Sequence, residues 1–176
     1  MVKTLRRIYS AVTSVIVALL VILVILLAGV RVVGWTPYTV LSGSMEPTYH
    51  VGSLIYVRAI DPMTLQVGDP VTYYGNDGAV VTHRIVAVLD DPVSGRCYRT
   101  KGDANNIEDG KLLYPTGVIG KPDFTIPYLG YVSWYIQHPP GTYVAISGAV
   151  VLLMMTLLTD VIFPEQKETE ESEETE

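Results

Sequence analysis

Cysteine is almost absent from this chain, whose 176 residues include only Cys97. A single cysteine excludes an internal disulfide framework and any zinc site built from cysteines. Basic residues are also scarce, because 12 lysines and arginines face 18 aspartates and glutamates, and they form no basic stripe. Nucleic-acid binding requires such a stripe, so nucleic acid is not an expected partner.

Long uncharged runs are present, over residues 11–30 and 141–159. Each approaches the roughly 20 apolar residues that a helix needs to cross a bilayer core. The first exceeds the roughly 7–15 residues of a signal-peptide core, and no convincing small-x-small cleavage site follows it, so we predict an uncleaved spanning helix over 11–33. The second predicts another spanning helix over 142–163, with an interfacial helix as the alternative because Asp160 lies near its end.

The charges that flank the first run set the expected orientation. Residues 1–10 contain Lys3, Arg6 and Arg7, which favour a cytoplasmic N-terminus because basic residues next to a span stay inside. We therefore expect an integral membrane protein whose middle region lies on the extracytoplasmic side. Residues 164–176 are mostly glutamate and other polar residues, which predicts an acidic, disordered tail.

The region between the two spans, residues 34–141, favours β structure. Stretches rich in Val, Tyr, Ile and Thr alternate with Gly, Pro and Asp turns, including a hairpin turn at 76–78. We expect no helix of useful length there, and we predict a mainly β fold: a small antiparallel, β-barrel-like domain tethered by the two spanning helices. The expected strands cover 53–58, 71–74, 79–88, 96–101 and 117–120.

An aromatic cluster precedes the second uncharged run. Such rings are typical of the interface between membrane and water, although they could instead fill the β core. The residues concerned are Tyr128, Tyr131, Trp134 and Tyr135.

A serine that follows the first span closely, Ser44, is a candidate nucleophile, although a Ser-Gly-Ser segment before proline is commonly just a turn. Of the three histidines, His50, His83 and His138, His83 is the preferred base. It shares a strand face with Val81 and Ile85, and apolar surroundings favour a neutral imidazole. A histidine buried in the core without catalytic function is the alternative.

The loop 100–110 contains the acidic residues that could orient His83. Asp103 and Asp109 are both candidates, and the residues alone do not choose between them. Lys101 could instead act as the base of a Ser-Lys dyad. The loop could also be a plain turn, whereas a calcium site is disfavoured because the EF-hand spacing and its final glutamate are missing.

Four segments, taken in order, resemble the sequence boxes of type I signal peptidases. The resemblance is to the archaeal and endoplasmic-reticulum subtype, which also occurs in some Gram-positive bacteria. The bacterial subtype has a lysine where His83 precedes Arg84. The segments are SGSMEPT at 42–48, GSLIYV at 52–57 with GDPV at 68–71, THRI at 82–85, and KGDAN at 101–105.

The resemblance implies a serine endopeptidase that removes signal peptides from secretory preproteins after a small-x-small motif. It implies Ser44 as nucleophile, His83 as general base, Asp103 or Asp109 as the orienting residue, and the hydroxyl of Ser42 with the amide of Ser44 as oxyanion donors. It implies no metal or organic cofactor. The expected partners are secretory preproteins and membrane lipid, with the secretion translocon as a further candidate, in the cell membrane or the endoplasmic reticulum. Two rival functions stay open: a self-cleaving repressor-type protease and a non-catalytic membrane scaffold.

Overall fold

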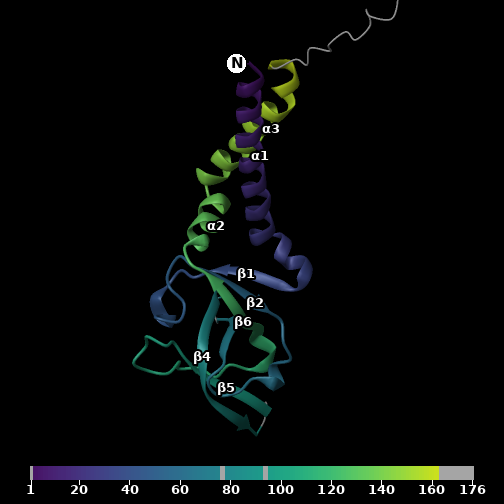
Figure 1. Cartoon of the computed structure of the whole chain (residues 1–176). Coiled ribbons are helices and arrows are strands. Elements are labelled where there is room, and N and C mark those ends of the chain that lie inside the picture. The colour runs from purple at the N-terminus through teal and green to yellow at the C-terminus, as the bar shows by residue number, and fades with distance from the viewer. Residues whose placement is uncertain (1, 76–77, 93–94, 163–176) are drawn as a thin grey trace, which may run out of the picture.

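A stalk of helices stands on one side of a β domain in the computed structural model, which describes residues 2–75, 78–92 and 95–162 (Figure 1). The helices are α1 (Val2–Leu27), α2 (Leu129–Gln137) and α3 (Gly141–Ile162). The strands are β1 (Trp35–Thr39), β2 (Leu54–Arg58), β3 (Pro70–Tyr74), β4 (Val80–Asp91), β5 (Gly95–Lys101) and β6 (Val118–Ile126). Short 3-10 helices are η1 (Gly29–Val33), η2 (Gly43–Met45), η3 (Pro62–Thr64) and η4 (Pro115–Gly117).

The six strands of the described ranges form one sheet in the order β1-β2-β6-β3-β4-β5, and every neighbouring pair is antiparallel. The predicted antiparallel β domain is therefore confirmed. The sheet is open, with β1 and β5 at its edges, so the barrel-like closure that we expected is not found. Pro37 suits β1 to an edge, because proline has no N–H to donate to a further strand. The register shifts on both sides of β6, where the sheet bends without closing.

The five expected strands correspond to β2 through β6, with ends that differ by up to six residues. Besides the short 3-10 helices, two elements were not expected, the edge strand β1 and the short helix α2. The sequence predicts no helix in the middle region, and this expectation was wrong for α2. The hairpin turn lies partly outside the described residues, at positions 76–77, although β3 and β4 do pair around it.

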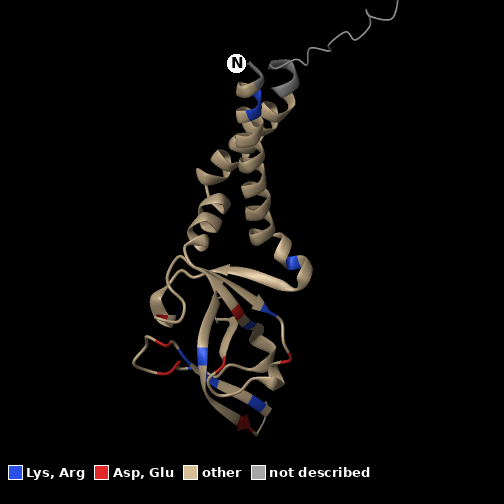
Figure 2. Cartoon of the chain, viewed as in Figure 1, with Lys and Arg blue, Asp and Glu red and all other residues tan. Residues whose placement is uncertain are grey.

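Among the residues that the structure describes, two helices are long and apolar enough to cross a membrane, over Thr4–Leu27 and Gly141–Leu158. Figure 2 shows basic residues at the N-terminal end of α1 and just beyond its other end, with no charge between them. The hydroxyl of Tyr9 donates to the carbonyl oxygen of Met155 at 3.0 Å, which joins α1 to α3 near the end of the stalk. The expected tail at 164–176 lies outside the described residues.

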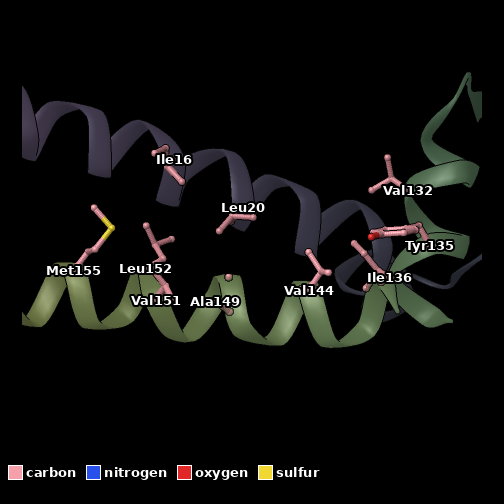
Figure 3. Close-up of a pocket in the computed structure, with 13 residues that line it drawn as sticks. Ile16, Leu20, Val132, Tyr135, Ile136, Val144, Ala149, Val151, Leu152 and Met155 are labelled. Carbon is pink, nitrogen blue, oxygen red and sulfur yellow. The ribbon is translucent and has the colours of Figure 1, made fainter. Parts of the chain in front are cut away.

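Closer to the β domain, a cavity of about 530 Å³ separates α1 from α2 and α3. Its walls are apolar, as Figure 3 shows for Ile16 and Leu20 of α1 and for Val144 and Leu152 of α3. The cavity extends along α3 as far as Met155, the residue whose carbonyl oxygen Tyr9 contacts.

The end of α1 is fixed to the sheet through Tyr56, whose hydroxyl donates to the carbonyl oxygen of Leu26 at 2.9 Å. Val30, Leu54 and Tyr56 form a buried cluster at this junction. The stalk therefore meets the domain at β2.

The aromatic residues before α3 lie on the surface. Their exposed fractions are 76% for Tyr128, 54% for Tyr131, 49% for Trp134 and 46% for Tyr135. Rings this exposed do not fill the β core, and their place beside the apolar helices agrees with an interfacial cluster.

Candidate active site

Ser44 lies in η2, a 3-10 turn between β1 and β2. Met45 anchors this turn in the core, because its side chain is buried against Tyr49 and Ile55. On the other side, the backbone N–H of Ala104 donates to the carbonyl oxygen of Ser44 at 2.9 Å. The backbone of the serine is thus fixed while its half-buried side chain lines a cleft.

His83 reaches this serine from β4. Its Nε2 atom lies 3.2 Å from Oγ of Ser44, and the residue is only 9% exposed. Its surroundings are less apolar than we expected: Ile85, two residues along, belongs to the core, but the imidazole itself faces Tyr73 and a carboxylate.

That carboxylate belongs to Asp109, whose Oδ2 lies 2.7 Å from Nδ1 of His83. The backbone N–H of Asp109 donates to the carbonyl oxygen of Thr100 at 2.8 Å, which fastens the loop to the end of β5. With Nδ1–H donating to Asp109, Nε2 is free to accept the hydroxyl proton of Ser44. The three side chains form one chain of hydrogen bonds from carboxylate to hydroxyl.

Asp103, the other acidic candidate, has different partners. Nε of Arg84 donates to its Oδ1 at 2.8 Å and Nη2 donates to its Oδ2 at 2.6 Å. The hydroxyl of Thr48 donates to Oδ2 at 2.6 Å. The hydrogen bonds from Arg84 hold the pKa of Asp103 below its ordinary value, with that from Thr48 acting in the same direction. Asp103 therefore joins its loop to β4 and to the segment after Ser44, without a hydrogen bond to the imidazole.

The alternative bases lie elsewhere. Lys101 pairs with Arg84 across β4 and β5, so its side chain leaves the sheet on the face opposite to His83. The ring of His50 pairs with Glu46, and Nδ1 of His138 donates to the carbonyl oxygen of Trp134 at 2.7 Å. In the part of the chain that the structure describes, His83 is the one candidate base with a hydrogen bond to Ser44.

Ser42, the expected oxyanion donor, lies two residues before Ser44 with its Oγ 3.4 Å from Oγ of Ser44. Its side chain is exposed. The hydroxyl is thus within reach of a group bound at Ser44.

The cleft around these residues has a volume of about 1040 Å³. Its walls come from the segment after β1, from the start of β4 and from α2, and it extends to Leu27 at the end of α1 and to Arg31 in η1. No group of three His, Cys, Asp or Glu side chains among the described residues is placed to hold a metal ion. The chemistry that this geometry can perform is nucleophilic attack by a serine with a histidine as base.

Two polar residues next to Asp109, Tyr73 and Thr100, were missed in the sequence. The hydroxyl of Thr100 donates to Oδ2 at 2.6 Å and that of Tyr73 at 3.2 Å. The signal that could have found them is register, because in a sheet with known pairing both share the face of His83.

Comparison with known proteins agrees with the resemblance found in the sequence. Residues 12–101 match the family described as signal peptidase, peptidase S26. The rat signal peptidase complex catalytic subunit SEC11C is 34% identical over an alignment of 127 residues, with 65% of this chain and 65% of that protein covered. Its human counterpart is 33% identical over the same length and shares. Signal peptidase I W of Bacillus subtilis (strain 168) is 44% identical over 79 residues, or 44% of this chain and 41% of that protein. The chain thus matches less than two thirds of the length of these relatives.

Proposed function

The chain belongs to the signal peptidase family, peptidase S26, and on this premise we propose that it is a membrane-bound serine endopeptidase that removes signal peptides from secretory preproteins. The observation that carries the proposal is the hydrogen-bonded series Ser44, His83 and Asp109, with distances of 3.2 Å and 2.7 Å. Of the two candidate aspartates, Asp109 is assigned the orienting role because its carboxylate meets Nδ1 of His83.

In this mechanism Oγ of Ser44 attacks the carbonyl carbon of the scissile peptide bond while Nε2 of His83 takes the hydroxyl proton. His83 then gives this proton to the leaving amine, which departs as the new N-terminus of the mature protein. A water molecule, deprotonated by the same imidazole, hydrolyses the acyl-enzyme and frees the signal peptide. Asp109 stabilises the imidazolium that forms in each half of the reaction.

The negative charge on the tetrahedral intermediate needs donors near Ser44. The backbone N–H of Ser44 and the hydroxyl of Ser42 are the groups assigned to this role. Each such donor contributes on the order of 3 kcal/mol to lowering the barrier.

The substrate is proposed to bind as an added β-strand along the start of β4. Strand β5 pairs with β4 only from Arg84 onwards, so the edge over residues 80–83 has no strand partner on that side among the described residues. A peptide laid on this edge would pass Ser44 and project alternate side chains into the cleft. Aromatic and aliphatic side chains restrict the space there and favour small substrate residues; they include Tyr38, Val40, Met45, Ile55 and Val81.

Both apolar helices are proposed to span the membrane, with the N-terminus in the cytoplasm and the β domain on the opposite side. The cleft extends to the end of α1, so a substrate held in the same bilayer would reach Ser44 at a raised effective concentration. Membrane lipid and preproteins are then the partners. The secretion translocon is proposed as a further partner, which co-purification would test.

Incubation of the purified protein with a model preprotein tests this function. We expect one cut after a small-x-small motif, located by mass spectrometry, and no product from Ser44→Ala or His83→Ala. Ser147→Ala is the matched control, because this exposed serine of α3 donates only to backbone carbonyls of its own helix. Full activity in Ser44→Ala would end the assignment.

Chemical labelling distinguishes a peptidase from a non-catalytic scaffold. If the protein is a peptidase, a serine-reactive mimic of a signal peptide should label the wild type at Ser44 and leave Ser44→Ala unmodified. Folded protein that binds partners but never reacts with this probe would favour the scaffold.

A further inference from the structure

Oδ2 of Asp109 is approached by side chains from three adjacent strands. Nδ1 of His83 (β4) lies at 2.7 Å, Oγ1 of Thr100 (β5) at 2.6 Å and the hydroxyl of Tyr73 (β3) at 3.2 Å. Asp109 itself belongs to no strand and lies on the loop after β5. A carboxylate on a loop is thus held by groups on the sheet.

The strand register explains why these groups meet. Val71 is opposite His83, so Tyr73, two residues further along β3, leaves the sheet on the same face as His83. Thr100 is opposite Ile85, which also lies two residues from His83. The alternation of side chains therefore directs the imidazole and both hydroxyls to one face.

Tyr73 contacts both Asp109 and His83. Its hydroxyl meets Asp109 and lies 3.3 Å from Oγ1 of Thr100, while its ring approaches His83 edge-on at a centroid distance of 6.4 Å. Burial raises the pKa of Tyr73 to about 12, and the charge of Asp109 acts in the same direction. The phenol therefore keeps its proton near neutral pH and can only donate to the carboxylate.

We propose that Tyr73 and Thr100 are positioning residues, which hold the carboxylate of Asp109 against Nδ1 of His83 and so direct Nε2 towards Ser44. The proposal rests on the proposed function. Neither residue lines the cleft, so neither is expected to touch substrate. Two donors on Oδ2 fix one rotamer of Asp109 and also withdraw negative charge from the atom that binds the imidazole.

Removing either hydroxyl should affect turnover more than binding. We expect kcat to fall about 2- to 10-fold in Tyr73→Phe and in Thr100→Val, the usual range for one lost hydrogen bond, with KM unchanged. Thr100→Ser keeps the hydroxyl and should keep kcat, which separates the hydrogen bond from the packing of this buried residue. Tyr74→Phe is the matched control, because this exposed neighbour points to the other face.

The pH dependence provides a readout that a purely structural role would not move. With one donor fewer, Oδ2 carries more negative charge and holds the imidazolium proton of His83 more strongly. The pH of half-maximal kcat/KM on the acid side should therefore rise in Tyr73→Phe and stay unchanged in Tyr74→Phe.

The same shift can be measured without catalysis, by nuclear magnetic resonance of histidine-labelled protein across a pH series. The titration midpoint of His83 should be higher in Tyr73→Phe than in the wild type, even in a Ser44→Ala background. This measurement tests the positioning role independently of the proposed function. A failure to cleave any preprotein would count against the proposed function alone. Unchanged titration of His83 in both Tyr73→Phe and Thr100→Val would overturn the positioning role.

Discussion

Nδ1 of His83 lies 2.7 Å from Oδ2 of Asp109, on the side of the imidazole that faces away from Ser44. Asp103, six residues earlier, instead forms a two-point ion pair with Arg84. The two aspartates of one loop therefore have different partners, and we predict that their substitution separates catalysis from stability.

Asp109→Asn should lower kcat by on the order of 10³ to 10⁴, because an amide can support the wrong tautomer of its histidine. Asp103→Asn should lower kcat less than tenfold and cost about 1–3 kcal/mol of stability, since it weakens charged hydrogen bonds to Arg84. Single-turnover cleavage and thermal unfolding in detergent would measure these effects. Equal losses of activity in two variants of native stability would contradict the division of roles.

Stability should fall in acid because of Asp103. Hydrogen bonds from Arg84 lower its pKa in the folded protein, so between the folded and unfolded pKa values the unfolded chain binds more protons. The contribution is complete above the unfolded value of about 3.9 and is lost as the pH falls through the lower folded value. The melting temperature of Asp103→Asn should therefore decrease less below pH 4 than that of the wild type. Asp90→Asn, at an exposed carboxylate, should follow the wild type, and a parallel decrease in Asp103→Asn would contradict the prediction.

Much of the sheet could be predicted because its strands are separated by clear turns of Gly, Pro and Asp. β1 was missed because Pro37 interrupts a strand of only five residues, and its place depends on pairing with β2. α2 was missed because nine residues are too few to establish a helical period. Its buried positions are Gly130 and Ser133, and Gly130 lies against the backbone of Gly52 and Ser53, a contact that the sequence does not reveal.

The site could be predicted only in part, since Ser44 and His83 are 39 positions apart and only the resemblance joins them. Which of the two aspartates contacts His83 depends on where the loop turns. The turn is fixed by the hydrogen bond from the backbone N–H of Asp109 to the carbonyl oxygen of Thr100. The expectation that His83 has apolar surroundings was wrong for a related reason. The alternation of side chains along one strand places Ile85 on the same face as His83, but it does not predict that a carboxylate from a loop also reaches the imidazole.

The proposed orientation predicts which residues can be labelled from outside an intact cell. The native thiol, Cys97, is 0% exposed and should give little background with a membrane-impermeant maleimide. Met63→Cys, at a position 51% exposed in the β domain, should be labelled in intact cells. Thr4→Cys, near the N-terminus, should be labelled only after permeabilisation. The reverse pattern would invert the topology.

Gly102 should be required for activity although it performs no chemistry. A Cβ atom added there would lie 2.5 Å from the carbonyl oxygen of Ser44 and 2.7 Å from Nδ2 of Asn105, closer than atoms approach without displacement. The nearer of these atoms is backbone, so Gly102→Ala would move the Ser44 turn or break the hydrogen bond from Ala104 to it.

Displacement of the nucleophile by even one ångström can cost on the order of 100-fold in rate, so Gly102→Ala should lose activity far beyond its loss of stability. Gly110→Ala is the matched control, because a Cβ atom at this exposed end of the same loop would meet nothing within 4 Å. Kinetics of preprotein cleavage, read beside melting temperatures, compares the two. If Gly102→Ala and Gly110→Ala cleave equally fast, the loop does not hold the serine in place, and the close approach at Gly102 has no bearing on catalysis.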